Sequence, residues 1–407
     1  MMNRKLIKRV ITCQGTIQLV TALSVLAHRE REQQHLGYQY ENYLVIYELY
    51  APSEQVDEFV VLIKKMAELV SDWKAIVYIS PEELKNIEIK LKTTGYSKIF
   101  KIVHELVGID SPNEIYLCRN WQFGNKLLIN TYRSAEKICY GDSIGIYFSQ
   151  NSPVISPVPK ISKTPLLHHV IQDKIVGLIR NIKHYLKLKT VLKDIDFNIG
   201  YFILPNILGE KPPMKVITTD KLSLLEKFHK MRCLVELEYV DYLCYKIGNA
   251  PVSVLLTSNL SEADRMSMDN EIAAYKKFLM TEKIDPDSVL VLKPHPRDSE
   301  VKIRKLENTL ADLYTEVVTL SKQNLFFLPF EVFFMAAFLN SDLTFTNKLR
   351  VFAVSSACLS LSLLFNVPCV VGFGEQITSS TFYENYVGSR LQHEQDLRVA
   401  IDAIKDK

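Results

Sequence analysis

The chain has 407 residues, of which 47% are hydrophobic and 23% are charged, and its formal net charge is +3 at pH 7. This length allows two hydrophobic cores, and the composition is that of a globular protein and not of a disordered one. The small net charge does not favour a general nucleic-acid binder, so we expect no nucleic acid among its partners. The seven cysteines form no CxxC pair, which is typical of reduced core cysteines in a cytoplasmic protein.

The N-terminal segment is basic over residues 1–9 and fairly apolar over residues 10–27, a pattern that superficially matches a secretory signal. Residues 12–16 interrupt the apolar pattern, and no run approaches the ~18 apolar residues that a membrane span needs. We therefore predict a strand over residues 5–12 that leads through a turn into a helix over residues 16–30. The protein is expected to be cytoplasmic, or peripheral to the inner face of a membrane.

The turn after this first strand contains Gly15, which permits a sharp bend or a close approach of the backbone to a ligand. We expect Gln14, Gly15 and Thr16 to form a wall of a substrate cleft, near the transferred group or the acceptor. The other interpretation is an ordinary strand-to-helix turn in which Thr16 caps the helix. The segment does not match GxGxxG, so the sequence does not predict a dinucleotide site.

Strand-like and helix-like patterns then alternate along the first half of the chain. Strands are predicted over residues 43–47, 73–79 and 114–118, and helices over residues 55–69, 81–91 and 97–107. This alternation is typical of a doubly wound parallel sheet. Arg119 and Asn120 follow the end of the third of these strands. Arg119 is suited to contact a carboxylate and Asn120 a hydroxyl of a ligand, although a plain surface loop is the other interpretation.

A further strand, predicted over residues 137–140, ends in the sequence Gly141-Asp142-Ser143-Ile144-Gly145. In open parallel sheets, ligands bind beyond the carboxyl ends of the strands, which is where this pattern places the Asp142 carboxylate. The flanking glycines allow a ligand to approach closely. An aspartate in a glycine-containing turn is also common without any function.

A helix predicted over residues 166–188 has an apolar stripe on one side and a lysine-rich face on the other. The basic face is suited to contact an anionic lipid or glycan, which makes a peripheral membrane contact one interpretation. The other interpretation is an ordinary solvated face.

A helix predicted over residues 222–245 is followed by the turn cluster Gly248-Asn249-Ala250-Pro251, where we place the domain boundary. Residues 1–247 are expected to form a Rossmann-like domain on the acceptor side of the cleft. Residues 248–407 are expected to form a second, nucleotide-sugar-binding Rossmann-like domain that ends in a terminal helix. The first strand of this domain ends at Thr257 and Ser258, which are expected to contact the donor phosphate or base.

Two apolar, strand-like runs in the second half end in polar groups. The first ends in Lys293-Pro294-His295-Pro296, where the two prolines present the imidazole of His295 from a stiff turn. The second ends in Ser355-Ser356 before a helix-like segment, so two hydroxyls join the free N–H groups of a helix N-terminus. Together these features predict a site where a phosphate is held and protonated.

The combination of Lys293-Pro294-His295-Pro296, Pro329-Phe330-Glu331 and Ser355-Ser356 before a helix resembles bacterial sialyltransferases and polysialyltransferases. The resemblance implies the GT-B fold, an α/β architecture in which two Rossmann-like, doubly wound domains face a central cleft. It also implies that Asp142 deprotonates the acceptor hydroxyl, that Glu331 binds the ribose hydroxyls and that Lys293 lies at the donor site. The acidic motif departs from the family pattern, because Ser143 stands where a glycine or a second acid is expected.

The resemblance implies an inverting, metal-independent glycosyltransferase that moves sialic acid or a related ulosonate from a CMP-sugar to a glycan or glycolipid hydroxyl. The donor leaves one phosphate, which hydrogen-bond donors can hold, so we expect no metal and no cofactor besides the CMP-sugar substrate. Three alternatives stay open: a CDP-polyol phosphotransferase of the GT-B type, a GT-B enzyme that uses a UDP-sugar, and a non-catalytic glycan-binding scaffold with the same fold.

Overall fold

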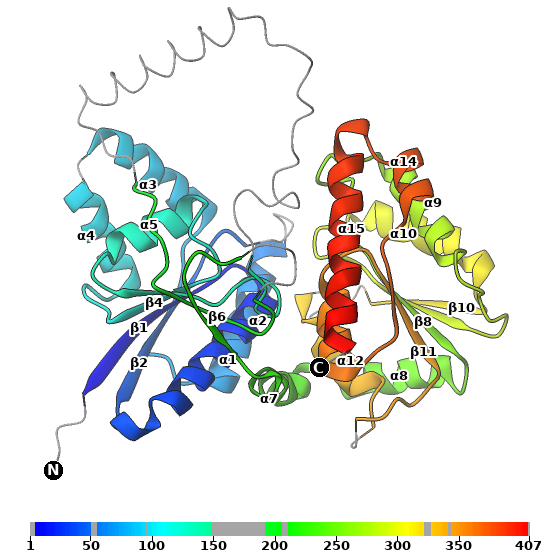
Figure 1. The fold of residues 1–407 in the computed structure, drawn as a ribbon, viewed down its shortest axis with the longest axis horizontal. Helices are drawn as coiled ribbons and strands as arrows, with labels where there is room; N and C mark the ends of the chain where they lie inside the picture. Colours follow the sequence, from blue (N-terminus) through cyan, green and yellow to red (C-terminus); the bar gives the residue numbers. More distant parts are fainter. Residues whose placement is uncertain are drawn as a thin grey trace, which may run out of the picture.

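The computed structural model describes residues 5–49, 55–94, 96–147, 192–205, 211–320, 327–340 and 343–405. These residues form two α/β domains that lie side by side (Figure 1). The basic helix predicted over residues 166–188 lies outside the described residues. Among the helices that are described, none combines the length and the apolar character needed to cross a membrane.

The first domain contains a seven-stranded sheet in the order β3-β2-β1-β4-β5-β6-β7, and every pair of neighbouring strands is parallel. The strands are β1 (Leu6–Cys13), β2 (Gln39–Ile46), β3 (Ala75–Tyr78), β4 (Glu114–Leu117), β5 (Glu136–Cys139), β6 (Ile199–Phe202) and β7 (Lys215–Thr218). The strand order reverses its direction between β1 and β4. In such doubly wound sheets, ligands bind at this switch point, beyond the carboxyl ends of the strands.

Helices cover both faces of this sheet because neighbouring residues of the central strand β1 are buried in different cores. Ile11 packs with α1 (Thr16–Glu32) and α2 (Val56–Val70) on one face. Val10 packs on the other face with α3 (Pro81–Thr93), α4 (Tyr96–Val107) and α5 (Phe123–Thr131). These two buried faces explain why the strand reads as an almost continuous apolar run.

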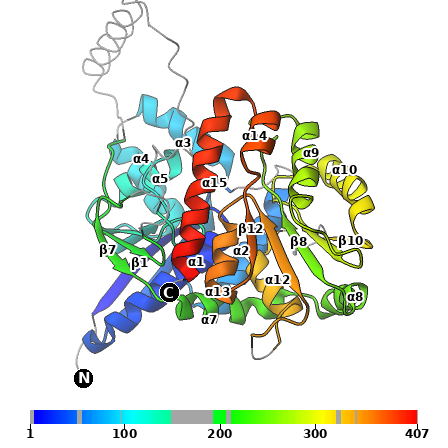
Figure 2. The ribbon, with the colours of Figure 1, turned by 45° about the vertical axis from the view of Figure 1, so that its right-hand side comes forward.

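The second domain contains a five-stranded parallel sheet in the order β10-β9-β8-β11-β12. Its strands are β8 (Val252–Leu256), β9 (Val289–Lys293), β10 (Glu316–Thr319), β11 (Leu349–Ala353) and β12 (Cys369–Val371). Its helices are α9 (Met268–Leu279), α10 (Glu300–Leu310), α12 (Phe330–Ala337), α13 (Ala357–Phe365), α14 (Glu375–Thr381) and α15 (Glu384–Lys405). The terminal helix α15 packs on α13, α14 and β12 of its own domain (Figure 2). The predicted fold of two doubly wound, Rossmann-like domains is therefore confirmed.

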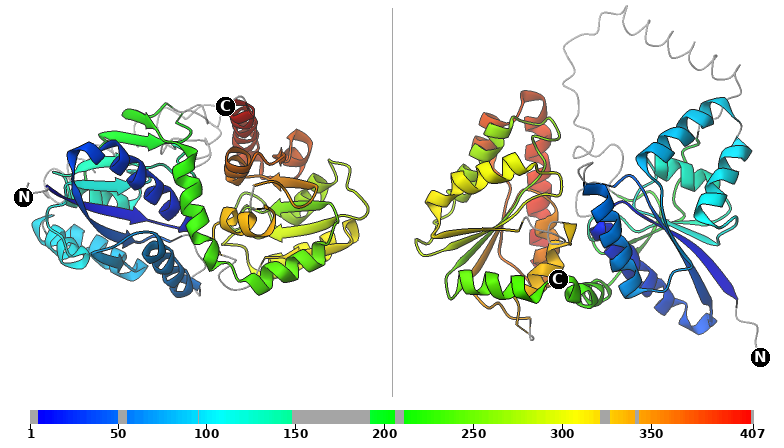
Figure 3. Two further views of the ribbon diagram at one scale, coloured as in Figure 1. Left: turned by 90° about the horizontal axis from the view of Figure 1, so that it is seen from below. Right: turned by 180° about the vertical axis from the view of Figure 1, so that it is seen from behind.

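The segment that joins the domains differs from the single helix predicted over residues 222–245. It forms α7 (Lys221–Met231), a 3₁₀ turn (Arg232–Leu234) and α8 (Leu237–Ile247). Helix α7 packs on α1 and α2 and also reaches α12 and α13, so it lies between the two domains (Figure 3). Helix α8 packs on α12 and β10, and its buried residues Val240, Leu243 and Ile247 belong to a hydrophobic cluster that continues across both domains. The contacts of α8 thus lie with the second domain, although our division at residue 247 assigned it to the first.

Candidate active site

Two adjoining pockets lie between the domains. The pocket of about 470 Å³ contains Glu331 and is called the Glu331 pocket; the pocket of about 550 Å³ contains Arg390 and is called the Arg390 pocket. Both are lined by Thr16, Ile17, Asp142, Ser258, Asn259, His295, Pro296, Ser355 and Ser356. Because they share these lining residues, the two pockets are neighbouring parts of one cleft. The walls of the cleft come from both domains, at the carboxyl ends of the two sheets.

The structure places most of the predicted site residues in this cleft. The Glu331 pocket is lined by Asp142, Thr257, Ser258, Lys293, His295, Glu331, Ser355 and Ser356, and Gly15 lines the Arg390 pocket. Asn120 lines neither pocket, because its side-chain amide donates to the carbonyl of Ile195 at 3.1 Å. This hydrogen bond holds the loop after β4 against the segment before β6, and the ligand contact of Asn120 stays a prediction.

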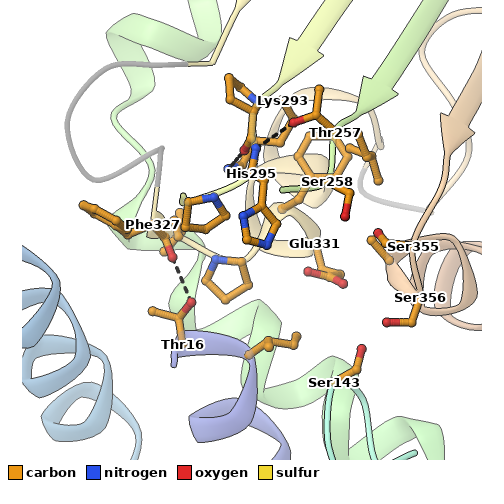
Figure 4. A pocket seen from close by; sticks show the side chains of 18 of the residues that line it. Thr16, Ser143, Thr257, Ser258, Lys293, His295, Phe327, Glu331, Ser355 and Ser356 are labelled. Carbon is orange, nitrogen blue, oxygen red and sulfur yellow. Dashed lines mark hydrogen bonds between the residues drawn. The ribbon is translucent and has the colours of Figure 1, made fainter. Parts of the chain in front are cut away.

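The backbone of the turn after β9 fixes the imidazole of His295. The N–H of His295 donates to Thr257 Oγ1 at 2.8 Å and to Asp298 Oδ2 at 2.9 Å. The N–H of Arg297 donates to His295 Nδ1 at 3.1 Å. Because Nδ1 accepts a hydrogen bond, the ring proton lies on Nε2. Figure 4 shows the His295 ring among the side chains that line the pocket, and Pro294 and Pro296 belong to the same lining.

A buried ion-pair network supports this turn from behind. Lys302 Nζ lies 2.8 Å from Asp298 Oδ1, 2.7 Å from Glu271 and 3.0 Å from Glu262. The side chains of Lys302, Asp298 and Glu271 are 0% exposed. Our sequence analysis missed these residues, although an aspartate three residues after the histidine and a lysine four residues further on were visible signals.

Burial lowers the pKa of His295 to about 3, and the positive charges of Lys293 and Arg297 act in the same direction. The imidazole is therefore neutral at physiological pH and offers an Nε2–H donor, not an imidazolium proton. A bound phosphate would raise this pKa again, because an opposite charge favours the protonated ring. Burial also lowers the pKa of Lys293 to about 8, which leaves its ammonium group mostly charged beside the pocket.

The Ser355-Ser356 pair lies between the end of β11 and the start of α13. Ser356 occupies the N-cap position of α13, with φ −62° and ψ −6°, but its hydroxyl makes no capping hydrogen bond. The ordinary N-cap interpretation therefore does not describe this serine, and both hydroxyls line the pocket beside the helix N-terminus. Hydroxyls and backbone N–H groups in this arrangement can bind an anion.

Glu331 lies in the first turn of α12 and is 6% exposed. The hydroxyl of Ser360 donates to its Oε1 atom. Burial raises the pKa of the Glu331 carboxyl above its usual value. Apolar side chains, including Phe330 and Leu361, line the pocket around it. This part of the pocket combines an apolar surface with one carboxyl group, which suits a flat ring joined to a hydroxyl-bearing sugar.

On the opposite wall, Asp142 is held by three donors. Its Oδ1 atom accepts from Gln18 Nε2 and from the Ser143 N–H, each at 2.9 Å, and its Oδ2 atom pairs with Arg119. A carboxylate offers about four lone-pair directions, so at most about one is left for a ligand. Ser143 has φ 50°, in the left-handed region that favours glycine, at the position where the resemblance leads us to expect a glycine or a second acid.

One contact joins the two walls directly. Thr16 Oγ1 donates to the carbonyl of Phe327 at 2.8 Å, so the Thr16 side chain crosses the cleft and does not cap its own helix (Figure 4). The ring of Phe59 from α2 stacks on the ring of Phe327, with centroids 4.7 Å apart. These contacts fix the separation of the domains at one end of the cleft.

Within the part of the chain that the structure describes, no cluster of three or more His, Cys, Asp or Glu side chains could hold a metal ion. The expectation of metal-independent transfer stays a prediction.

The structure is similar to several solved structures of low sequence identity. A UDP-GlcNAc 2-epimerase from Neisseria meningitidis bound to UDP-GlcNAc is 10% identical, with 99% of this chain and 100% of that chain covered and a TM-score of 0.47. A UDP-N-acetylglucosamine 2-epimerase described for Listeria monocytogenes is 12% identical, with coverage of 98% and 90% and a TM-score of 0.47. The spinosyn rhamnosyltransferase SpnG complexed with thymidine diphosphate is 8% identical, with coverage of 98% and 95% and a TM-score of 0.41. At these TM-scores the similarities carry no conclusion about substrates.

No curated protein matches the chain. The family model for alpha-2,8-polysialyltransferase matches residues 9–337, which is more than half of the chain and includes Asp142, His295 and Glu331. The chain therefore belongs to the alpha-2,8-polysialyltransferase family and is a glycosyltransferase with the GT-B fold.

Proposed function

We propose that this glycosyltransferase moves sialic acid or a related ulosonate from a CMP-sugar to a hydroxyl of a glycan or glycolipid, with inversion and without a metal ion. The observation that carries the proposal is that Asp142 from one domain and His295, Ser355 and Ser356 from the other line the same pocket. This arrangement offers a base on one side of a reacting carbon and a phosphate site on the other.

On the donor side, the departing phosphate gains charge as the bond to the sugar breaks. The Nε2–H of His295 and the hydroxyls of Ser355 and Ser356 are suited to stabilise this charge. The ammonium group of Lys293 adds a positive charge at the same wall. The neutral ring stabilises this charge as a hydrogen-bond donor and keeps its Nε2 proton, because Nδ1 accepts from the Arg297 N–H and carries none.

On the acceptor side, the attacking hydroxyl must lose a proton as the new bond forms. Asp142 is the carboxylate placed to accept it, and the Gln18 and Arg119 contacts leave room for one such hydrogen bond. A base and a phosphate site on opposite walls favour in-line displacement, which inverts the configuration at the reacting carbon.

The nucleoside part of the donor is assigned to the Glu331 pocket. The Oε2 atom of Glu331 is available for a ribose hydroxyl, since Ser360 engages Oε1. The apolar lining beside it is suited to the face of the pyrimidine ring.

CMP release in the presence of an oligosialic acid acceptor tests the proposal. Asp142→Ala and His295→Ala are each expected to lower the rate by about 10²–10⁴-fold, because each removes a group that acts on a proton or a charge in the transition state. Matched controls are Asp194→Ala, whose side chain is 83% exposed, and His35→Ala on an exposed turn. Full activity in both site variants would contradict the proposal.

Product analysis, nucleotide competition and calorimetry separate the other candidate functions. Transfer of a phosphate to the acceptor would indicate a CDP-polyol phosphotransferase. Stronger competition by UDP than by CMP would indicate a UDP-sugar enzyme. Calorimetry in which neither nucleotide binds would favour a non-catalytic scaffold.

A further inference from the structure

The Arg390 pocket has walls of its own besides those that it shares with the Glu331 pocket. It is additionally lined by Arg265, which follows β8, and by Arg390 and His393 of the terminal helix α15. Because Ser258, His295, Ser355 and Ser356 line both pockets, a group in the Arg390 pocket lies next to the expected phosphate site. The proposed function gives this space no occupant so far.

The lining of the Arg390 pocket carries an excess of positive charge. Four arginines line it (Arg119, Arg265, Arg297 and Arg390), and its one acidic side chain is Asp142, which pairs with Arg119. Glu394 pairs with Arg390 but is 0% exposed and lies behind the pocket wall. There it accepts from the N–H groups of Phe373 and Gly374, each at 2.9 Å. The carboxylate that balances Arg390 therefore does not itself face the cavity.

Two side chains of this wall are buried with unsatisfied nitrogen atoms. Arg390 is 5% exposed and His393 is 7% exposed. Arg390 Nη2 and His393 Nδ1 have no hydrogen-bond partner among the described residues. Leaving such a group unsatisfied costs about 1–3 kcal/mol, so native proteins rarely do so without a reason. Both nitrogen atoms are themselves covered by neighbouring groups, so a ligand with hydrogen-bond acceptors would reach them only after a shift of the two side chains toward the cavity.

The charges of this wall also repel one another. Burial lowers the pKa of Arg265, and the charge of Arg390 lowers it further. Burial lowers the pKa of His393 to about 3, with Arg390 and Arg265 acting in the same direction. An anion between these three side chains would relieve the repulsion, which a neutral ligand cannot do.

We propose that the Arg390 pocket binds the carboxylate of an acidic sugar through Arg390, His393 and Arg265. The inference rests on the proposed function, since it assigns the place of the sugar next to the donor phosphate. A carboxylate matches the planar fork of an arginine side chain and accepts several hydrogen bonds at once. Two sugars can supply this group, the one on the donor and the terminal one on the acceptor.

Calorimetry with three probes tests the inference: CMP, a non-transferable 3-fluoro analogue of CMP-sialic acid, and oligosialic acid. His393→Leu and Arg265→Met are expected to weaken binding of one sugar-bearing probe by about 10–100-fold, the range of a lost hydrogen bond to a charged group. Binding of CMP, which has no carboxylate, is expected to change by less than about twofold, within the scatter of near-neutral substitutions. Weaker binding of the donor analogue alone assigns the carboxylate to the donor, and weaker binding of oligosialic acid alone assigns it to the acceptor.

Arg398→Met is the matched control, because Arg398 also approaches Glu394 from α15, at 3.4 Å, but does not line the pocket. Arg390→Lys keeps a cation near Glu394 and loses Nη2. It therefore repeats the binding test with less risk of misfolding than a neutral substitution, which would leave the Glu394 carboxylate buried without its partner. Equal losses for CMP and the sugar-bearing probes, or no loss with any probe, would overturn the inference. If the wild type binds oligosialic acid but no CMP, the proposed function fails and the acceptor probe still decides the inference. If the wild type binds none of the three probes, both fail.

Discussion

The two walls of the cleft are held by different kinds of interactions. In the second domain, His295 is fixed by Asp298, only three residues away, and Asp298 is held by Lys302 four residues further on. In the first domain, Asp142 is held by Gln18, 124 residues away, and by Arg119, 23 residues away. The His295 wall adds one bond to Thr257 of a neighbouring strand end to these local contacts, whereas the side-chain partners of Asp142 both come from distant elements and only the Ser143 N–H is local.

This difference suggests different roles for the supporting residues. A phosphate site must be rigid in advance, since preorganised donors stabilise charge without rearranging. A base must instead stay accessible and correctly aimed at a hydroxyl. Substitutions behind the His295 turn are therefore expected to lower mainly the free energy of unfolding, and substitutions around Asp142 are expected to lower mainly kcat.

The largest effect is expected from Lys302→Met. Without the ammonium group, the buried carboxylates of Asp298 and Glu271 lose their partner, so the free energy of unfolding should fall by about 3–5 kcal/mol. Lys305→Met on the same helix breaks an exposed pair with Asp269 and should cost at most about 1 kcal/mol. Urea unfolding of both variants measures the difference. Equal losses would show that the network does not support the second wall.

Arg119→Met tests the first wall. Without Arg119, the Asp142 carboxylate loses the ion pair that aims it, and kcat should fall by about 10–100-fold. The KM for the donor should stay within about twofold, and Arg119→Lys should restore part of kcat, because Arg119 positions the base and does not bind the donor in our proposal. Arg133→Met, at an exposed position, is the control. A raised donor KM with unchanged kcat would place Arg119 at the donor site instead.

The comparison of the two walls also shows which features of the site can be predicted from the sequence: those whose residues lie close together in the chain. The Lys293-Pro294-His295-Pro296 and Ser355-Ser356 patterns were recognisable because the chemistry and the stiff turn lie within a few residues. Both sheets were predictable from the alternation of strands and helices, as β8 and β9 illustrate. The helix predicted over residues 222–245 divides into α7, which packs mainly on α1 and α2 of the first domain, and α8, which packs on α12 and β10 of the second.

The sequence does not predict the positions of side chains that meet only through the fold. Arg119 and Asn120 are neighbours in sequence, yet Arg119 faces Asp142 in the cleft and Asn120 binds the Ile195 carbonyl outside it. No local pattern shows which side of a strand end a side chain takes. Arg390 and His393 carry no motif, and only the docking of α15 beside β12 brings them to the cleft.

The second wall should also make folding stability depend on pH through the half-buried His295 and the buried His393. Their pKa values are lowered to about 3 by burial, compared with about 6.5 in the unfolded chain. Between these pH values the unfolded state binds protons that the folded state excludes. The contribution of the two histidines to the free energy of unfolding is therefore fully present above about pH 6.5 and is lost as the pH drops toward 3. Each histidine should contribute about 1.4 kcal/mol per pH unit in this window.

Urea unfolding between pH 7 and pH 5 measures this slope. His295→Gln and His393→Gln should each flatten it, because glutamine does not titrate, whereas His35→Gln on the exposed turn should leave it unchanged. A wild-type slope that neither substitution alters would mean that both rings bind protons as readily in the folded protein as in the unfolded chain, and so become charged below about pH 6.5. The second wall would then present imidazolium groups and not neutral donors.

The smallest effect is expected at the contact that joins the walls. Thr16→Val removes the hydroxyl that donates to the Phe327 carbonyl at 2.8 Å but keeps the shape of the side chain. The loss of one such hydrogen bond costs about 1 kcal/mol, which corresponds to about a fivefold change in an equilibrium. Because the stack of Phe59 on Phe327 remains, the domains should stay associated, and the donor KM should rise by at most about that factor. Thr16→Ser keeps the hydroxyl and should behave as the wild type. If Thr16→Val lowered kcat as strongly as Arg119→Met, the two walls would act as one unit. The wall that carries His295 and the wall that carries Asp142 would then not have the separate roles assigned to them above.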